Sequence, residues 1–155
     1  MTWIMVLLAV LGGATLSIQS ATNGKLGGQV GVFHTAFLTF FLGMLVTGLL
    51  ILFFENSREV GLMDVPKWQL LGAFCGVPYI LAMVLAVKRI GTATATVAVI
   101  FGQLLMSLLI DNFGWFGNAA INFSPTRLLA AGCLAVALYF IYSSNKAQQK
   151  LQANP

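Results

Sequence analysis

One apolar stretch, residues 91–117, carries polar side chains whose types and spacing could do chemistry inside a membrane. It is uncharged over roughly its first twenty residues, until Asp111, about the length of a helix that crosses a bilayer. Helical spacing puts five polar residues on one face: Thr92, Thr96, Gln103, Ser107 and Asp111. Because hydrocarbon cannot hydrogen-bond an amide or a carboxylate, this face is expected to meet other helices or a water-filled cavity.

Two interpretations of this polar face are open. Its side chains bind a small polar ligand, or they hold helices together, since Thr, Ser and Gln often form contacts between membrane helices. For Thr92 and Thr96 the two interpretations are about equal. Gln103 and Asp111 favour binding, because their polar groups are costlier to place in a membrane.

A second polar face is expected on the first apolar run, about residues 3–22. Gln19 and Asn23 share this face with Gly12 and Thr15. Asn23 is followed by Gly24, a pair typical of a helix end, so we favour a C-terminal cap over binding for Asn23. Gln19 lies inside the helix, and for it binding and packing are equally open.

Two further residues are candidates for function. Pro78 is expected to kink the third helix, and interrupted helices near the midplane are where transporters build binding sites. Tyr79, the next residue, is therefore a candidate ligand contact; the alternative is a hydroxyl bonded to a freed backbone carbonyl. His34 is the single histidine. It could relay protons, although a contact with headgroups or a loop is the favoured interpretation.

The composition places these residues in an integral membrane protein. Of the 155 residues, 59% are hydrophobic and only 8% are charged, whereas a soluble domain carries about 25% charged residues. We expect one all-α transmembrane domain over residues 1–145 and a polar, frayed tail over 146–155. The five expected helices span about residues 3–22, 32–54, 68–87, 91–111 and 126–143.

Several function classes are disfavoured by the sequence. It has no basic patch interleaved with aromatic residues, so no nucleic-acid partner is expected. The glycine-rich segment 24–31 lacks the Gly-Lys-Ser/Thr ending of a phosphate loop. No Ser-His pair, metal-ligand cluster or paired carboxylates occur at membrane depth, so neither an enzyme nor a bound metal or cofactor is expected. The expected partners are the lipid bilayer and a small molecule.

Five helices would place the two termini on opposite sides of the membrane, and the basic residues favour one orientation only weakly. The N-terminal side carries three basic residues, Arg58, Lys67 and Arg127. The opposite side carries five, Lys25, Lys88, Arg89, Lys146 and Lys150. Because basic residues stay on the cytoplasmic side, this count slightly favours an outer N-terminus and an inner C-terminus. Insertion in both orientations stays open.

Several motifs along nearly the whole chain resemble one family of membrane proteins. They are Gln19 with Asn23-Gly24 and Leu26, Phe40 to Gly43, Pro66 with Trp68, Gly102-Gln103-Leu104 with Ser107, Ile110 to Gly114, and Pro125 with Arg127. The sequence resembles the YdcZ-like family, five-helix proteins of the drug/metabolite transporter superfamily. The family often has His at the position of Asn112. This chain therefore lacks one titratable group that is common in the family.

The resemblance implies a bacterial inner-membrane protein that corresponds to half of a ten-helix transporter. Because those transporters consist of two inverted five-helix repeats, it implies an antiparallel pair, either a homodimer or a complex with a homologous five-helix partner. The implied function is transport of a small metabolite or drug-like compound by alternating access. The candidate ligand contacts are Gln19, Asn23, Tyr79, Gln103 and Ser107. Asp111 would bind a proton or anchor the loop through Arg127.

The sequence leaves two alternatives to this function. A small multidrug exporter would exchange protons for hydrophobic cations through a membrane-embedded glutamate in the first helix. At that depth this chain has Gly12 to Thr15 and no acid, so a cation would lack a counter-charge. A non-transporting assembly subunit would use the polar faces only to join helices.

Overall fold

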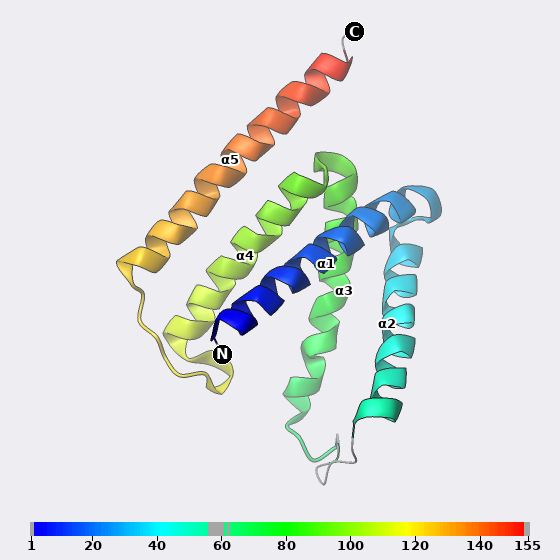
Figure 1. Ribbon diagram of the computed structural model, residues 1–155, viewed down its shortest axis with the longest axis vertical. Helices are drawn as coiled ribbons and strands as arrows, with labels where there is room; N and C mark the ends of the chain where they lie inside the picture. Colours follow the sequence, from blue (N-terminus) through cyan, green and yellow to red (C-terminus); the bar gives the residue numbers. More distant parts are fainter. Residues whose placement is uncertain (1, 56–60, 62, 154–155) are drawn as a thin grey trace. The chain divides into compact units, whose positions relative to one another are not determined.

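The computed structural model describes residues 2–55, 61 and 63–153, with side chains described as far as residue 147, and within these ranges the fold is all-helical and has no strand. Five helices are long and apolar enough to cross a membrane, which confirms the predicted fold class. The long helices are α1 (Thr2–Val30), α2 (Val32–Phe54), α3 (Gly72–Ile90), α4 (Thr92–Phe113) and α5 (Pro125–Ala153), shown in Figure 1. Short 3-10 helices precede α3 (η1, Lys67–Leu71) and follow α4 (η2, Trp115–Gly117).

The exposed surfaces of the helices are apolar, as expected for helices surrounded by lipid. Large apolar side chains are exposed along every long helix, for example Trp3 at 85%, Leu52 at 78% and Phe53 at 77%. Such a surface would associate or aggregate in water, whereas in hydrocarbon it needs no cover. The 22 residues of α4 give a length of about 33 Å at 1.5 Å per residue, close to the roughly 30 Å of a bilayer core.

The predicted end of the first helix near residue 22 is wrong. The helix α1 continues to Val30, so Asn23 lies inside it and is not a C-terminal cap. The chain instead turns at Gly31, whose φ of 93° lies in the left-handed region that glycine adopts without a steric penalty. A similar glycine turn joins α3 to α4, where Gly91 has a φ of 80°.

The predicted ends of the later helices also differ from the structure. The helix α5 reaches Ala153, ten residues past the predicted end at 143, so the segment 146–153 is helical rather than frayed. Helical propensity explains this extension, because Lys, Ala, Gln and Leu predominate between residues 146 and 153. The third helix starts later than predicted because η1 occupies residues 67–71.

The chain divides into two compact units, residues 1–88 and 89–155. That residues 1–145 act as one domain therefore stays a prediction. In the first unit α1, α2 and α3 meet where two glycines of α1 face α3. A Cβ on Gly24 would overlap the Val87 side chain, and one on Gly27 would overlap Val84 and approach Thr35 Oγ1 at 3.6 Å. These glycines therefore allow close helix packing, as small residues do in membrane proteins.

In the second unit α4 and α5 run antiparallel (Figure 1), and a polar contact joins them at each end. At one end the Asn145 amide of α5 donates a hydrogen bond to Thr94 Oγ1 of α4 at 2.5 Å. At the other end Arg127 contacts Asp111. Thr94 is only 1% exposed, so its bond to Asn145 satisfies a polar group removed from solvent.

Candidate functional site

The candidate site is a small hollow between α1 and α3 in the first unit. It brings together three of the five predicted ligand contacts, Gln19, Asn23 and Tyr79. The rest of its wall is formed by Leu16, Ser20, Ile80, Met83 and Val84. Gln19 and Asn23 lie four residues apart and so share one face of α1, and this face meets α3 because Gly24 and Gly27 let the two helices approach closely.

The polar groups at this hollow have unused hydrogen-bonding capacity. Among the described residues, the amides of Gln19 and Asn23 and the hydroxyl of Tyr79 form no hydrogen bond within the chain. The alternative role predicted for Tyr79, a bond to a carbonyl freed by Pro78, is therefore not found. Ser20 differs, because its Oγ donates to the Leu16 carbonyl at 2.8 Å. Two amides and a phenol thus offer donors and acceptors in an otherwise apolar setting.

The volume of the hollow limits what it can hold alone. Its cavity measures about 60 Å³, room for only a few water-sized groups. Pockets for drug-sized ligands measure roughly 300–1,000 Å³. A larger ligand would therefore need a further surface to close over the hollow.

The remaining predicted ligand contacts, Gln103 and Ser107, lie on α4 in the second unit. Both side chains are exposed, and neither forms a hydrogen bond among the described residues. The Thr96 hydroxyl on the same helix is buried and also lacks a partner in the described part of the chain. Since Gln103 lies within the apolar span, its amide needs protein or water, not lipid, as its neighbour.

Asp111 forms the ion pair that was one of its two predicted roles. Its Oδ2 lies 3.2 Å from Arg127 Nη1, and both side chains are a little over one third exposed, at 35% and 38%. The Asp111 carbonyl also accepts a hydrogen bond from the Ile121 amide at 2.8 Å. Asp111 thus bonds through its side chain to the start of α5 and through its backbone to the loop between α4 and α5. Proton binding by Asp111 stays a prediction.

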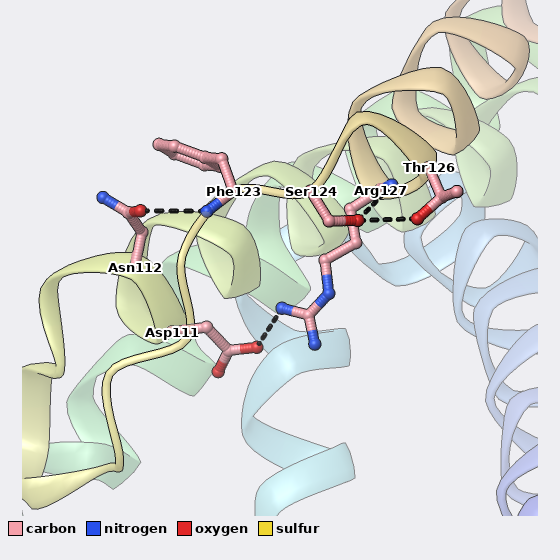
Figure 2. Close-up of polar contacts among 6 residues, drawn as sticks. All are labelled: Asp111, Asn112, Phe123, Ser124, Thr126 and Arg127. Carbon is pink, nitrogen blue, oxygen red and sulfur yellow. Dashed lines mark hydrogen bonds and ion pairs between the residues drawn. The ribbon is translucent and has the colours of Figure 1, made fainter.

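Neighbouring contacts fix the same loop to both helices (Figure 2). Asn112 Oδ1 accepts a hydrogen bond from the Phe123 amide at 3.2 Å. Ser124 Oγ accepts one from the Arg127 amide at 3.3 Å, so Ser124 caps α5, which starts at Pro125. These contacts explain the polar cluster at the end of α4 without a ligand.

His34 lies in the first turn of α2, where its side chain is exposed. It forms no hydrogen bond within the described residues. Its assignment as a proton-relay or structural residue stays a prediction.

Sequence reasoning missed several residues of the hollow. Ser20 is 6% exposed, and its place between Gln19 and Asn23 on α1 could have indicated it. Met83 and Val84 could not be found this way, because only the register of α3 against α1 brings them to the hollow. No group of three or more His, Cys, Asp or Glu that could hold a metal occurs in the described part of the chain.

The fold and the lipid-compatible surface define a multi-pass α-helical membrane protein. A family model described as "Putative inner membrane exporter, YdcZ" matches residues 4–140. The chain therefore belongs to the YdcZ family of the drug/metabolite transporters, and it is a membrane transporter of the inner membrane. This family is one of transporters rather than enzymes. No curated protein and no solved structure matches the chain.

Proposed function

We propose that the chain is half of an alternating-access transporter and that the hollow between α1 and α3 is its share of the binding site for a small polar or drug-like compound. The observation that carries this proposal is the set of three polar side chains, Gln19, Asn23 and Tyr79, which line the hollow without partners in the chain. Unpaired polar groups at membrane depth are costly, so they are retained where they serve function.

The small size of the hollow supports an antiparallel pair. At about 60 Å³ it cannot enclose a metabolite, and a second copy in the inverted orientation would supply a matching set of residues. Inverted repeats that meet at the bilayer midplane are a common transporter design. The exposed amide of Gln103 and the hydroxyl of Ser107 would then face protein or the ligand path.

The basic residues support a homodimer over a pair with a separate homologous chain. Three of them flank the membrane on the N-terminal side and five on the other, a weak bias for a rule that depends on such differences. A chain whose basic residues are so evenly distributed between the two sides is suited to insert in both orientations. Where one orientation predominates, it is the one with the C-terminus on the cytoplasmic side.

A ligand screen tests the proposed function. The purified protein in lipid nanodiscs is heated with each member of a panel of metabolites and drug-like compounds. A transported compound is expected to raise the melting temperature, since a ligand at 100 times its Kd stabilises the folded state by about 2.7 kcal/mol. Gln103→Leu is expected to abolish this increase while leaving the helical circular dichroism unchanged.

The screen separates the proposed function from the alternative of an assembly subunit. A subunit whose polar faces only join helices would show no ligand-dependent stabilisation by any compound. Unchanged ligand stabilisation in Gln103→Leu would remove Gln103 from the binding site.

A further inference from the structure

The unit of α4 and α5 contains a second candidate binding site, an apolar groove next to a basic hollow, as expected for a site that binds a lipid. Between the two helices lies an apolar groove of about 350 Å³. One wall consists of Thr94 and Ala98 on α4, together with Ile90 at the end of α3, and the other includes Ala135, Leu138 and Tyr142 on α5. The groove exceeds the hollow between α1 and α3 several-fold in volume and is suited to an acyl chain rather than to a polar solute.

A polar hollow of about 190 Å³ adjoins the groove at one end. Ile90 and Tyr142 line both spaces, so the two lie next to each other. Two cations, Arg89 and Lys146, and the amide of Asn145 complete the polar hollow. A positively charged space thus opens directly into an apolar one.

The two cations have no counter-charge among the residues that the structure describes. Neither Arg89 nor Lys146 forms an ion pair or hydrogen bond among the described residues. Asp111 is the only acidic residue between positions 89 and 155, and it pairs with Arg127 at the opposite end of α4. No acidic side chain of this unit is therefore left to neutralise the two cations, and an anionic ligand can do so.

The depth of these residues matches the parts of a phospholipid. Arg89 lies at the end of the span Lys67–Ile90, and Lys146 lies at the end of the span Pro125–Ala147, which is the headgroup level. Ala98 lies deeper, about 9 Å along α4 from its first residue, Thr92. A phosphate between Arg89 and Lys146 would thus continue into an acyl chain lying in the groove.

We propose that the hollow between α4 and α5 binds one anionic phospholipid, with its phosphate on Arg89 and Lys146 and one acyl chain in the groove that ends at Ala98 and Ala135. Basic pockets between membrane helices are a recognised means of binding anionic headgroups. The bound lipid links the turn at Gly91 to α5, next to the bond between Asn145 and Thr94, and so stabilises the antiparallel pair of helices.

Thermal melting and native mass spectrometry in phosphatidylcholine micelles test the proposal with dioleoyl phosphatidylglycerol as the probe. We expect one phosphatidylglycerol per chain and a higher melting temperature than with equal amounts of added dioleoyl phosphatidylcholine. The double variant R89Q/K146Q is expected to bind phosphatidylglycerol about 25-fold more weakly, since each cation near an anionic surface contributes about 5-fold. The matched control K25Q/K88Q removes two cations from the same side of the membrane outside the hollow, and it is expected to keep the wild-type affinity.

Two further experiments test whether a phospholipid, rather than a free phosphate, occupies the site. Ala98→Phe and Ala135→Phe fill the groove from opposite walls while keeping both cations, and either is expected to abolish the phosphatidylglycerol effect while circular dichroism shows intact helices. Inorganic phosphate is expected to cause no stabilisation, because it has no chain to place in the groove.

Four results would overturn the proposal. They are full affinity in R89Q/K146Q, an equal loss in K25Q/K88Q, full affinity in a folded groove variant, and stabilisation by inorganic phosphate alone. A second copy of the chain seated in the groove would appear as a dimer that Ala135→Phe disrupts without any response to phosphatidylglycerol.

Discussion

Replacing Gln19 with leucine is expected to weaken ligand binding at least about 10-fold while the protein still folds. The Gln19 amide lines the hollow between α1 and α3 and makes no bond within the described part of the chain, so no internal contact is lost. Leucine has a similar length and prefers lipid or an apolar wall. A lost hydrogen bond to a buried ligand costs about 1–3 kcal/mol, and we therefore expect affinity to fall about 10-fold or more.

The measurement is the ligand-induced increase in melting temperature for any compound that stabilises the wild type, followed by its uptake or efflux in vesicles. Thr22→Val is the matched control on the same helix. Thr22 is exposed, bonds only to the Ile18 carbonyl, and does not line the hollow. Equal ligand responses in Gln19→Leu and Thr22→Val would place the binding site elsewhere.

Replacing Gly27 with leucine is expected to destabilise the first unit strongly. Even a Cβ at Gly27 would overlap Val84, which is 1% exposed and lies in the cluster with Ala36 and Ile80. Added methylenes in a packed core typically cost 1–3 kcal/mol. A whole leucine side chain is expected to reach the upper end of this range, about 3 kcal/mol or more.

Gly28→Leu is the control at the adjacent position, where nothing lies within 4 Å of an added Cβ. Its side chain would face lipid, so its effect on stability is expected to be small. The measurement is the midpoint of unfolding in sodium dodecyl sulfate for both variants. Similar midpoints for Gly27→Leu and Gly28→Leu would contradict the close packing of α1 on α3. A partial rescue of Gly27→Ala by Val84→Ala would confirm which side chain is responsible.

The number and type of the long helices follow from the sequence because hydrocarbon admits only uninterrupted backbone hydrogen bonding. Each run of apolar residues therefore becomes a helix, and the cap at Ser124-Pro125 fixes the start of the last one. The end of the first helix could not be derived in this way. Asn23-Gly24 has the sequence of a cap, yet Gly24 serves the close approach of Val87, which depends on a helix about sixty residues away in the chain.

The candidate site was predictable in its residue types but not in its assembly. Helical periodicity put Gln19 and Asn23 on one face, and Pro78 drew attention to Tyr79. That these three residues meet depends on the register between α1 and α3, which only tertiary packing determines. The contact of Asp111 with Arg127 was easier to foresee, because a short loop joins the two helix ends that carry these residues.

If this chain alone supplies both halves of an inverted pair, as we propose, its C-terminus must lie on both sides of the membrane, and the orientation of the C-terminus can be measured. A single cysteine is appended after Pro155 in a background with Cys75 and Cys133 replaced by alanine. Intact cells are treated with a membrane-impermeant thiol reagent, before and after permeabilisation.

We expect about half of the chains to be labelled in intact cells and all of them after permeabilisation, because an antiparallel homodimer needs both orientations in equal number. Labelling of all chains or of none in intact cells would contradict it. A single orientation would show that any inverted partner is a different chain.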